Sequence, residues 1–243
     1  MITWQPSDYR RGTNQPEFNL EQIARGRYDA FITKWALALK ATRRPILLRF
    51  AHEMNGSWFP WGVGVNGNTP EKYIAAWRHI HTLFRDAGAN NVLWVWCPNI
   101  DNADPALFFP GDEYVDWLGL VGFNNADWGL WRSFSEIFAP TYSRITGLSS
   151  KPVMIAEVGT TEGTPQVPGN KAAWILDMYM REIPRDFTRV QAVVWFDEDK
   201  RDYGEGDYRI DTSSEALAAY KVAVGSTLYS SGRPRTANPP VIP

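Results

Sequence analysis

Six short apolar segments recur along the chain, separated by longer stretches in which apolar residues follow a helical spacing. The apolar segments are continuous rather than alternating, which is typical of strands buried on both faces of a parallel sheet. We predict strands at 1–4, 46–50, 92–96, 118–123, 153–156 and 191–196. The stretches between them predict helices at 28–40, 69–87, 170–181 and 214–224.

The boundaries of the helix at 69–87 are marked most clearly. Thr69 stands at the N-cap position, Pro70 follows as the first helical residue, and Gly88 comes after the last turn. The alternation of strands and helices predicts an α/β fold with a parallel sheet, and its length favours a (β/α)8 barrel of the TIM type. An open doubly wound sheet is the alternative, but no glycine-rich phosphate loop follows any predicted strand.

Composition narrows the classes of partner. Aromatic residues make up 14% of the 243 residues, including 12 Trp, and flat indole faces suit both a packed core and the faces of sugar rings. The net charge of −2 argues against nucleic acid or an anionic membrane as a partner. No apolar segment approaches the roughly 20 residues of a membrane span, and no signal peptide is visible. Cys97, the single cysteine, is expected to be a small buried residue.

The chain divides by composition into one large domain and a short tail. Residues 1–225 hold all the predicted strands and helices and are expected to form a single barrel domain. Residues 226–243 are rich in proline and predict a C-terminal tail or linker.

Two glutamates follow predicted strands at the end where barrel proteins carry their chemistry. Glu53 comes after the second strand and Glu157 after the fifth. A pair of carboxylates among Trp and Asn side chains fits glycoside hydrolysis, in which one carboxyl group protonates the leaving oxygen and the other attacks the anomeric carbon. The structural alternative is an ion pair between Glu157 and Arg49. Asn55 and Asn99 are either sugar ligands or turn residues.

Other kinds of catalysis find little support. His52 lies beside Glu53, but His79 and His81 fall inside a predicted helix, and no zinc-binding spacing exists. No serine stands in a nucleophile-elbow motif. We therefore expect no metal and no cofactor.

The segment Arg-Phe-Ala-His-Glu-Met-Asn-Gly at 49–56, with Trp58 and Trp61, closely resembles the acid/base signature of glycoside hydrolase family 26. The segment Lys-Pro-Val-Met-Ile-Ala-Glu at 151–157 resembles the nucleophile strand of that family, and the resemblance extends over 1–225. The family contains β-mannanases, mixed-linkage β-glucanases (lichenases) and some β-1,3-xylanases. The resemblance implies a (β/α)8 barrel and retaining double displacement, with carboxyl groups about 5–5.5 Å apart.

Carried onto this sequence, the resemblance makes Glu53 the acid/base and Glu157 the nucleophile. Residues implied to line the sugar subsites are His52, Asn55, Trp58, Trp61, Asn99 and Trp195, and Trp4, Phe123, Asn124 and Trp128 complete the candidate substrate-binding set.

Three departures from the family pattern stand out. Gln5 replaces a glutamate in the usual Thr-Trp-Glu-Pro segment, and Phe123 stands where many members carry a tyrosine that is hydrogen-bonded to the nucleophile. If Glu53 ends the fourth barrel strand, the segment at 1–4 is the third, and strands one and two have no sequence to form them. We therefore hypothesise an N-terminally truncated member of the family.

The function expected from the sequence is that of a retaining endo-β-glycanase. Its substrate would be a plant cell-wall β-polysaccharide, either β-1,4-mannan or mixed-linkage β-1,3-1,4-glucan. We expect a monomer that acts outside the cell, because the family is mostly secreted. The alternative is a non-catalytic carbohydrate-binding barrel fragment, which has no need of two glutamates.

Overall fold

The computed structural model describes residues 1–229, so most of the predicted tail, from residue 230 onward, lies outside the described residues. The chain forms two compact units. The first contains residues 1–121 and 141–152, and the second contains residues 122–140 and those from 153 onward.

Six strands follow one another in the sheet in the order of the chain, as predicted. The pairs β1–β2, β2–β3, β3–β4 and β5–β6 are all parallel. The strands are β1 (Ile2–Trp4), β2 (Ile46–Phe50), β3 (Val92–Trp96), β4 (Trp117–Asn124), β5 (Val153–Thr160) and β6 (Val190–Trp195). The predicted strand segments are confirmed because continuous Val, Ile and Leu runs are stable where both faces of a strand are covered.

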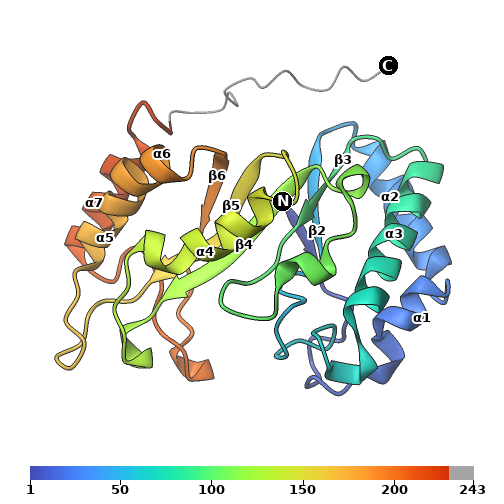
Figure 1. The fold of residues 1–243 in the computed structure, drawn as a ribbon, viewed down its shortest axis with the longest axis horizontal. Coiled ribbons are helices and arrows are strands. Elements are labelled where there is room, and N and C mark those ends of the chain that lie inside the picture. Colours follow the sequence, from blue (N-terminus) through green and yellow to red (C-terminus); the bar gives the residue numbers. More distant parts are fainter. Residues whose placement is uncertain (230–243) are drawn as a thin grey trace. The chain divides into compact units, whose positions relative to one another are not determined.

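Helices α1 (Leu20–Ala24), α2 (Asp29–Ala41) and α3 (Pro70–Asp86) belong to the first unit and lie beside β2 and β3 (Figure 1). α3 begins where the sequence predicts, since the side chain of Thr69 accepts a hydrogen bond from the Lys72 N–H. Its buried face carries Tyr73, Trp77 and Phe84. Short 3-10 helices in this unit are η1 (Pro16–Phe18), η2 (Val65–Gly67), η3 (Pro105–Phe108) and η4 (Asp112–Tyr114).

The second unit holds α5 (Lys171–Asp177), α6 (Ile183–Asp186), α7 (Ser214–Val224) and the 3-10 helices η5 (Ala126–Trp128) and η7 (Arg201–Tyr203). The predicted helix at 170–181 extends further, because a π-helical turn, η6 (Met178–Glu182), joins α5 to α6. Ile183 N–H bonds to the carbonyl of Met178, five residues back. This wider turn makes room for Pro184, which has no N–H and whose ring would otherwise clash with the preceding turn. α7 matches its prediction, and α4 (Phe134–Thr146), which was not predicted, begins in this unit and ends in the first.

The two faces of β1 and β2 differ in chemistry. On one face, the ring of Phe50 contacts Trp4 and also Trp77 of α3, so this face is covered by helices. On the other face, Arg49 Nε donates to the hydroxyl of Thr3 at 3.0 Å. Within the described residues, no helix is both long and apolar enough to cross a membrane.

Candidate active site

Glu53 lies in a tight turn that directly follows β2. Ala51 and Glu53 both adopt left-handed backbone conformations, with φ values of 44° and 54°. Such conformations cost a non-glycine residue roughly 1 kcal/mol or more, and they persist where surrounding contacts fix them. Here Ala51 N–H donates to the carbonyl of Trp4 at 3.0 Å and Glu53 N–H to that of Cys97 at 2.8 Å. The two neighbouring strands therefore fix the direction in which Glu53 projects.

The carboxylate of Glu53 is buried and accepts a hydrogen bond on each oxygen. The indole Nε1 of Trp58 donates to Oε2 at 2.7 Å, and Nδ2 of Asn99 donates to Oε1 at 2.7 Å. Only 7% of Glu53 is exposed. N–H donors of this kind stabilise the ionised form of a buried carboxyl group.

Asn55 holds Asn99 in place. Its Nδ2 donates to the carbonyls of Asn99 and Ala103, at 2.9 and 3.0 Å, and its Oδ1 accepts from Asn99 N–H at 2.9 Å. Asn102 adds a bond from Nδ2 to the Asn99 Oδ1 at 2.7 Å. With 2% of its surface exposed, Asn55 joins two loops in the manner of a turn residue, and any direct contact of its side chain with sugar stays a prediction.

The loop after Glu53 is built from stacked rings. The rings of Phe59 and Trp61 stack at 4.4 Å, and His52 contacts Phe59 with ring centroids 5.0 Å apart. Trp61 Nε1 donates to the His52 carbonyl at 2.7 Å, and only 1% of Trp61 is exposed. Trp58, by contrast, is 42% exposed. Of the two Trp residues predicted here, Trp58 presents its ring to solvent and Trp61 packs inside the loop.

His52 is held in its neutral form. Burial, and then the charge of Arg49, lower the pKa of His52 to about 3. Its Nδ1 has no hydrogen-bond partner. Among the described residues, no three His, Cys, Asp or Glu side chains gather in a way that could hold a metal ion. A neutral imidazole beside Glu53 adds a polar ring without adding a competing charge.

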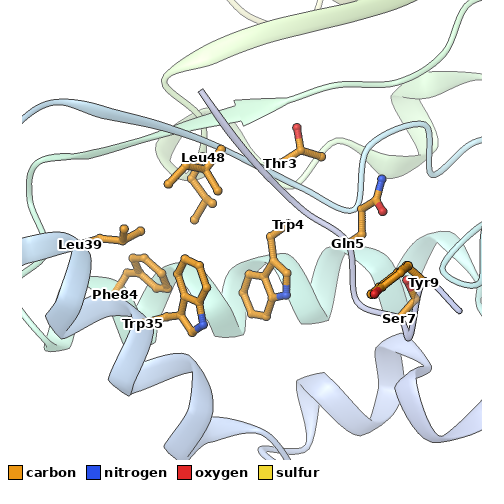
Figure 2. Close-up of a pocket in the computed structure, with 10 residues that line it drawn as sticks. Thr3, Trp4, Gln5, Ser7, Tyr9, Trp35, Leu39, Leu48 and Phe84 are labelled. Carbon is orange, nitrogen blue, oxygen red and sulfur yellow. The ribbon is translucent and has the colours of Figure 1, made fainter. Parts of the chain in front are cut away.

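The backbone of Trp4 contacts this turn, but its indole ring lies against Phe31 and Phe50. It lines a pocket of about 270 Å3 between β1 and α2, together with Trp35, Leu39 and Leu48 (Figure 2). The ring of Trp4 in this pocket contacts Phe50, and Thr3, whose hydroxyl accepts from Arg49 Nε, is also among the lining residues. Gln5 also lines the pocket. The part of Trp4 in substrate binding stays a prediction.

In the second unit, Glu157 is the half-buried residue in the middle of the otherwise buried strand β5. Both polar atoms of the Asn124 side chain are hydrogen-bonded within the protein. Its Nδ2 donates to the hydroxyl of Thr160 at 3.0 Å, and its Oδ1 accepts from Arg132 N–H at 2.9 Å. Trp128, at the end of η5, is 56% exposed. Trp128 is therefore the candidate in this unit with an open ring face.

Sequence reasoning missed Tyr208, which packs beside Phe123. Its ring lies 5.0 Å from that of Phe123, and it approaches Gly159 so closely that a Cβ there would stand 3.1 Å from it. Its hydroxyl accepts from Nδ2 of Asn125 at 3.1 Å. Because Gly159 is two residues beyond Glu157 on β5, Tyr208 supports the end of the strand that carries Glu157.

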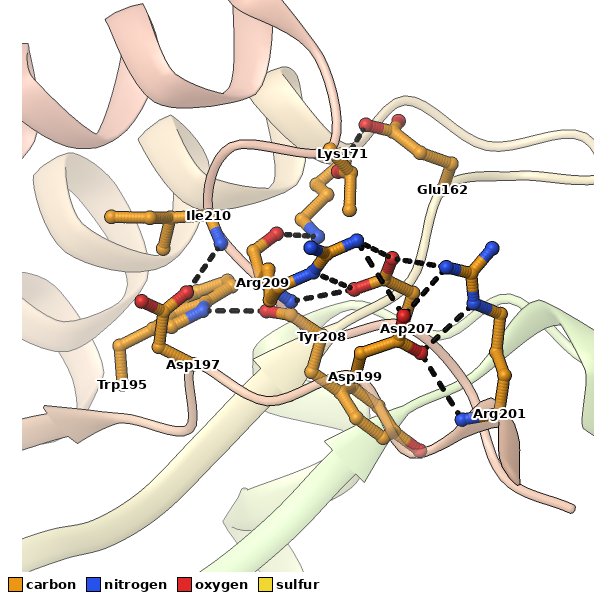
Figure 3. A network of polar contacts seen from close by, with 11 residues as sticks. Glu162, Lys171, Trp195, Asp197, Asp199, Arg201, Asp207, Tyr208, Arg209 and Ile210 are labelled. Carbon is orange, nitrogen blue, oxygen red and sulfur yellow. Dashed lines mark hydrogen bonds and ion pairs between the residues drawn. The ribbon is translucent and has the colours of Figure 1, made fainter. Parts of the chain in front are cut away.

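Three side chains bond to the backbone of three consecutive residues, Tyr208, Arg209 and Ile210 (Figure 3). Trp195 Nε1 donates to the Tyr208 carbonyl at 2.8 Å, Lys171 Nζ to the Arg209 carbonyl at 2.6 Å, and Ile210 N–H to Oδ1 of Asp197 at 2.8 Å. Trp195 is 8% exposed, and its N–H is used in this contact.

Two arginines and two aspartates form a network of ion pairs in the same loop. Arg201 bonds to Asp199 at 2.6 Å and Arg209 to Asp207 at 2.6 Å, and the cross pairs Arg201–Asp207 and Arg209–Asp199 lie at 3.3 and 3.5 Å. The hydrogen bond from Arg209 lowers the pKa of Asp207. Networks of exposed pairs stabilise a loop more than one isolated pair does.

Parallel strands followed by carboxylates, amides and indole rings are the arrangement that glycoside hydrolases place at the carboxyl ends of barrel strands. The chain belongs to Glycosyl hydrolase family 26, whose family model matches residues 8–166. The recognition made from the motif at 49–56 is thereby confirmed.

Curated relatives are named as endoglucanase, mannan endo-1,4-beta-mannosidase and beta-1,3-xylanase. Endoglucanase H of Acetivibrio thermocellus is 42% identical over 236 residues, which cover 93% of this chain and 24% of that protein. Mannan endo-1,4-beta-mannosidase of Bacillus subtilis is 28% identical over 142 residues, covering 55% of this chain and 36% of that protein. The chain therefore spans roughly a quarter to a third of the length of these relatives.

Solved structures confirm the α/β fold of TIM-barrel type. An endo-beta-1,4-mannanase from Cellulomonas fimi superposes with a TM-score of 0.67 at 22% identity, covering 88% of this chain and 50% of that one. A Bacillus subtilis mannanase gives 0.59 at 24% identity, covering 86% and 58%. The described part of this chain supplies six parallel strands of the fold.

Proposed function

We propose that the chain is an endo-acting glycanase that hydrolyses a β-linked glucan by retaining double displacement. The observation that carries the substrate is the 42% identity to an endoglucanase over 93% of the chain. The relatives named mannanases match shorter parts of it, such as 33% identity over 48% for the enzyme of Caldalkalibacillus mannanilyticus. β-1,4-Mannan is the second candidate substrate on the strength of these matches.

In the proposed reaction, the carboxylate of Glu157 attacks the anomeric carbon while the carboxyl proton of Glu53 moves to the leaving oxygen. The glycosidic C–O bond breaks and a covalent ester to Glu157 forms. Glu53 then takes a proton from water, whose oxygen attacks the anomeric carbon and releases Glu157. Because polymeric glucan lies outside cells, we also propose an extracellular place of action.

The environment of Glu53 in the first unit supports the acid/base assignment. The side chain is buried and oriented by a turn in which two residues are left-handed, and it is held by donors from two different loops. A non-catalytic carbohydrate-binding protein would need neither this turn nor a second glutamate on β5.

The test is release of reducing ends from barley β-glucan, glucomannan and galactomannan, with the Glu157→Gln variant as the blank. The proposal expects release from β-glucan by the natural sequence and none by the variant, while both bind the polymer in affinity electrophoresis. The anomer formed first, followed by proton NMR, reports retention. Release from galactomannan alone would move the substrate to mannan, and binding without release from any polymer would favour the non-catalytic alternative.

A further inference from the structure

Trp58 and Asn99, which both donate to Glu53, differ in how firmly they are held. Asn99 is fixed through its backbone N–H, its carbonyl and its side-chain oxygen, by bonds with Asn55 and Asn102. Trp58 is 42% exposed, and its indole makes one hydrogen bond, to Oε2 of Glu53, and an edge contact with Phe59 at 6.4 Å. Asn99 is therefore a fixed donor, and Trp58 is a donor that can be displaced by rotation of one side chain.

A glycine provides the seat for the Trp58 ring. A Cβ built on Gly56 would fall inside the van der Waals radius of the six-membered ring of Trp58. Gly56 does not have a left-handed backbone conformation, so the nearest obstacle to alanine there is the Trp58 ring and not the backbone torsion. The glycine thus lets the indole lie against the loop with its N–H at Glu53.

In the proposed reaction, the carboxyl group of Glu53 must exist in both a protonated and an ionised form. A general acid must carry a proton when it meets the leaving oxygen, whereas N–H donors on both carboxylate oxygens stabilise the ionised form. Removing an N–H donor from the carboxylate favours the protonated form. The donor that can leave is Trp58, and a sugar unit entering above an exposed indole is the event that would displace it.

We propose that Trp58 is a positioning residue whose indole N–H holds Oε2 of Glu53 in the empty site and leaves it when a glucan chain binds. This inference rests on the proposed function. The glycosidic oxygen of the bound β-linked glucan, which has no hydrogen to donate, then replaces the indole at Oε2. The acid becomes easier to protonate only after substrate has arrived.

The proposal predicts a split between two pH profiles. The profile of kcat/KM reports groups in the free enzyme, and the profile of kcat reports groups in the enzyme–substrate complex. Trp58→Phe keeps a flat ring but removes the N–H, so the alkaline limb of the kcat/KM profile should move up by at least half a pH unit. The alkaline limb of the kcat profile should stay in place, because Trp58 has already left Glu53 in the complex.

Three further variants make this test decisive. Gly56→Ala, which unseats the indole without removing it, should reproduce the split. Asn99→Ala removes the fixed donor and should move both profiles. Trp35→Phe, in an exposed indole on α2, should move neither. Equal shifts of both profiles in Trp58→Phe, or no shift in either Trp58→Phe or Gly56→Ala, would overturn the proposal.

A measurement without turnover separates this proposal from the proposed function. In 15N-tryptophan-labelled protein, the Trp58 indole signal is assigned by its loss in Trp58→Phe. The signal should titrate with pH in the natural sequence and lose that titration in Glu53→Gln. In Glu157→Gln, adding cellohexaose should speed exchange of this proton with water. If the signal titrates but the protein is inactive, the hydrogen bond between Trp58 and Glu53 exists and the proposed glycanase function is wrong. If exchange stays slow with bound cellohexaose, the ligand does not displace Trp58 from Glu53.

Discussion

The ammonium group of Lys171 donates to the carbonyl of Arg209 at 2.6 Å although no part of Lys171 is exposed to solvent. Its Nζ also lies 6.0 Å from the centre of the Trp195 ring. Glu162, Asp207 and Asp197 favour the charged form and Arg209 opposes it, but burial is the largest effect and lowers the pKa of Lys171 to about 8. The buried ammonium group of Lys171 therefore binds the backbone directly after Tyr208.

This pKa predicts how stability changes with pH. The unfolded lysine has an ordinary pKa of 10.5, so between about pH 8 and 10.5 the unfolded state binds more protons than the folded state. The contribution of Lys171 to the free energy of unfolding should therefore rise across this range, by up to about 3 kcal/mol. Urea unfolding at pH 7.5 and pH 10 measures it.

The matched control is Lys171→Met, which keeps the apolar stem and cannot titrate. The difference in unfolding free energy between the natural sequence and this variant should grow in favour of the natural sequence as pH rises. A difference that is constant from pH 7.5 to pH 10 would show that Lys171 keeps an ordinary pKa. Lys171→Arg, which remains charged throughout, should lose the pH-dependent part as well.

Asn55 predicts a second measurable effect, on stability. Asn55→Ala leaves the carbonyls of Asn99 and Ala103 without their donor and Asn99 N–H without its acceptor. Buried groups left without partners cost about 1–3 kcal/mol each, so we expect a loss of at least 2 kcal/mol in urea unfolding. Asn102→Ala removes bonds on the exposed side of the same loop and should cost less than half as much. Equal losses of unfolding free energy in the two variants would show that Asn55 is not the main residue that fixes this loop.

Much of the fold follows from local sequence, and the exceptions have physical causes. The strands are predicted because residues buried on both faces must be apolar along their whole length. α1 was missed because it has only five residues, and α4 because Pro140 interrupts its helical pattern. The position of Glu53 could be predicted from its motif, but its contact with Asn99 joins residues 46 apart in the chain. Tyr208 has no local signal at all, since Asn125 lies 83 residues away.

The role proposed for Glu53 predicts a dependence on the leaving group. Glu53→Ala removes the proton donor, and general acid catalysis contributes about 100- to 10,000-fold to such reactions. The rate on β-glucan should fall by that factor, whereas an aryl glucoside oligomer with a dinitrophenolate leaving group should lose at least tenfold less. Initial rates on both substrates measure the ratio. Equal losses on the two would remove Glu53 from the acid role while leaving it a contributor to the site.

Tyr208 offers a way to ask whether the loop after β6 supports β5. Burial raises the pKa of Tyr208 to about 12, and its hydroxyl accepts from Asn125 at 3.1 Å. Tyr208→Phe keeps the ring against Gly159 and Phe123 but leaves the buried amide of Asn125 without this acceptor, which should cost about 1–3 kcal/mol of stability. Tyr203→Phe, in a side chain that is 77% exposed, is the matched control and should change stability by less than about 0.5 kcal/mol.

The same pair of variants separates ring from hydroxyl in catalysis. Because the ring rather than the hydroxyl packs against β5, Tyr208→Phe should keep kcat on β-glucan within about threefold, while Tyr208→Ala should lower it tenfold or more by freeing the strand that carries Glu157. Urea unfolding establishes that each variant is folded at the assay temperature. If Tyr208→Phe loses as much activity as Tyr208→Ala, the hydroxyl itself acts in the reaction, and the support of β5 by the ring is not its main contribution.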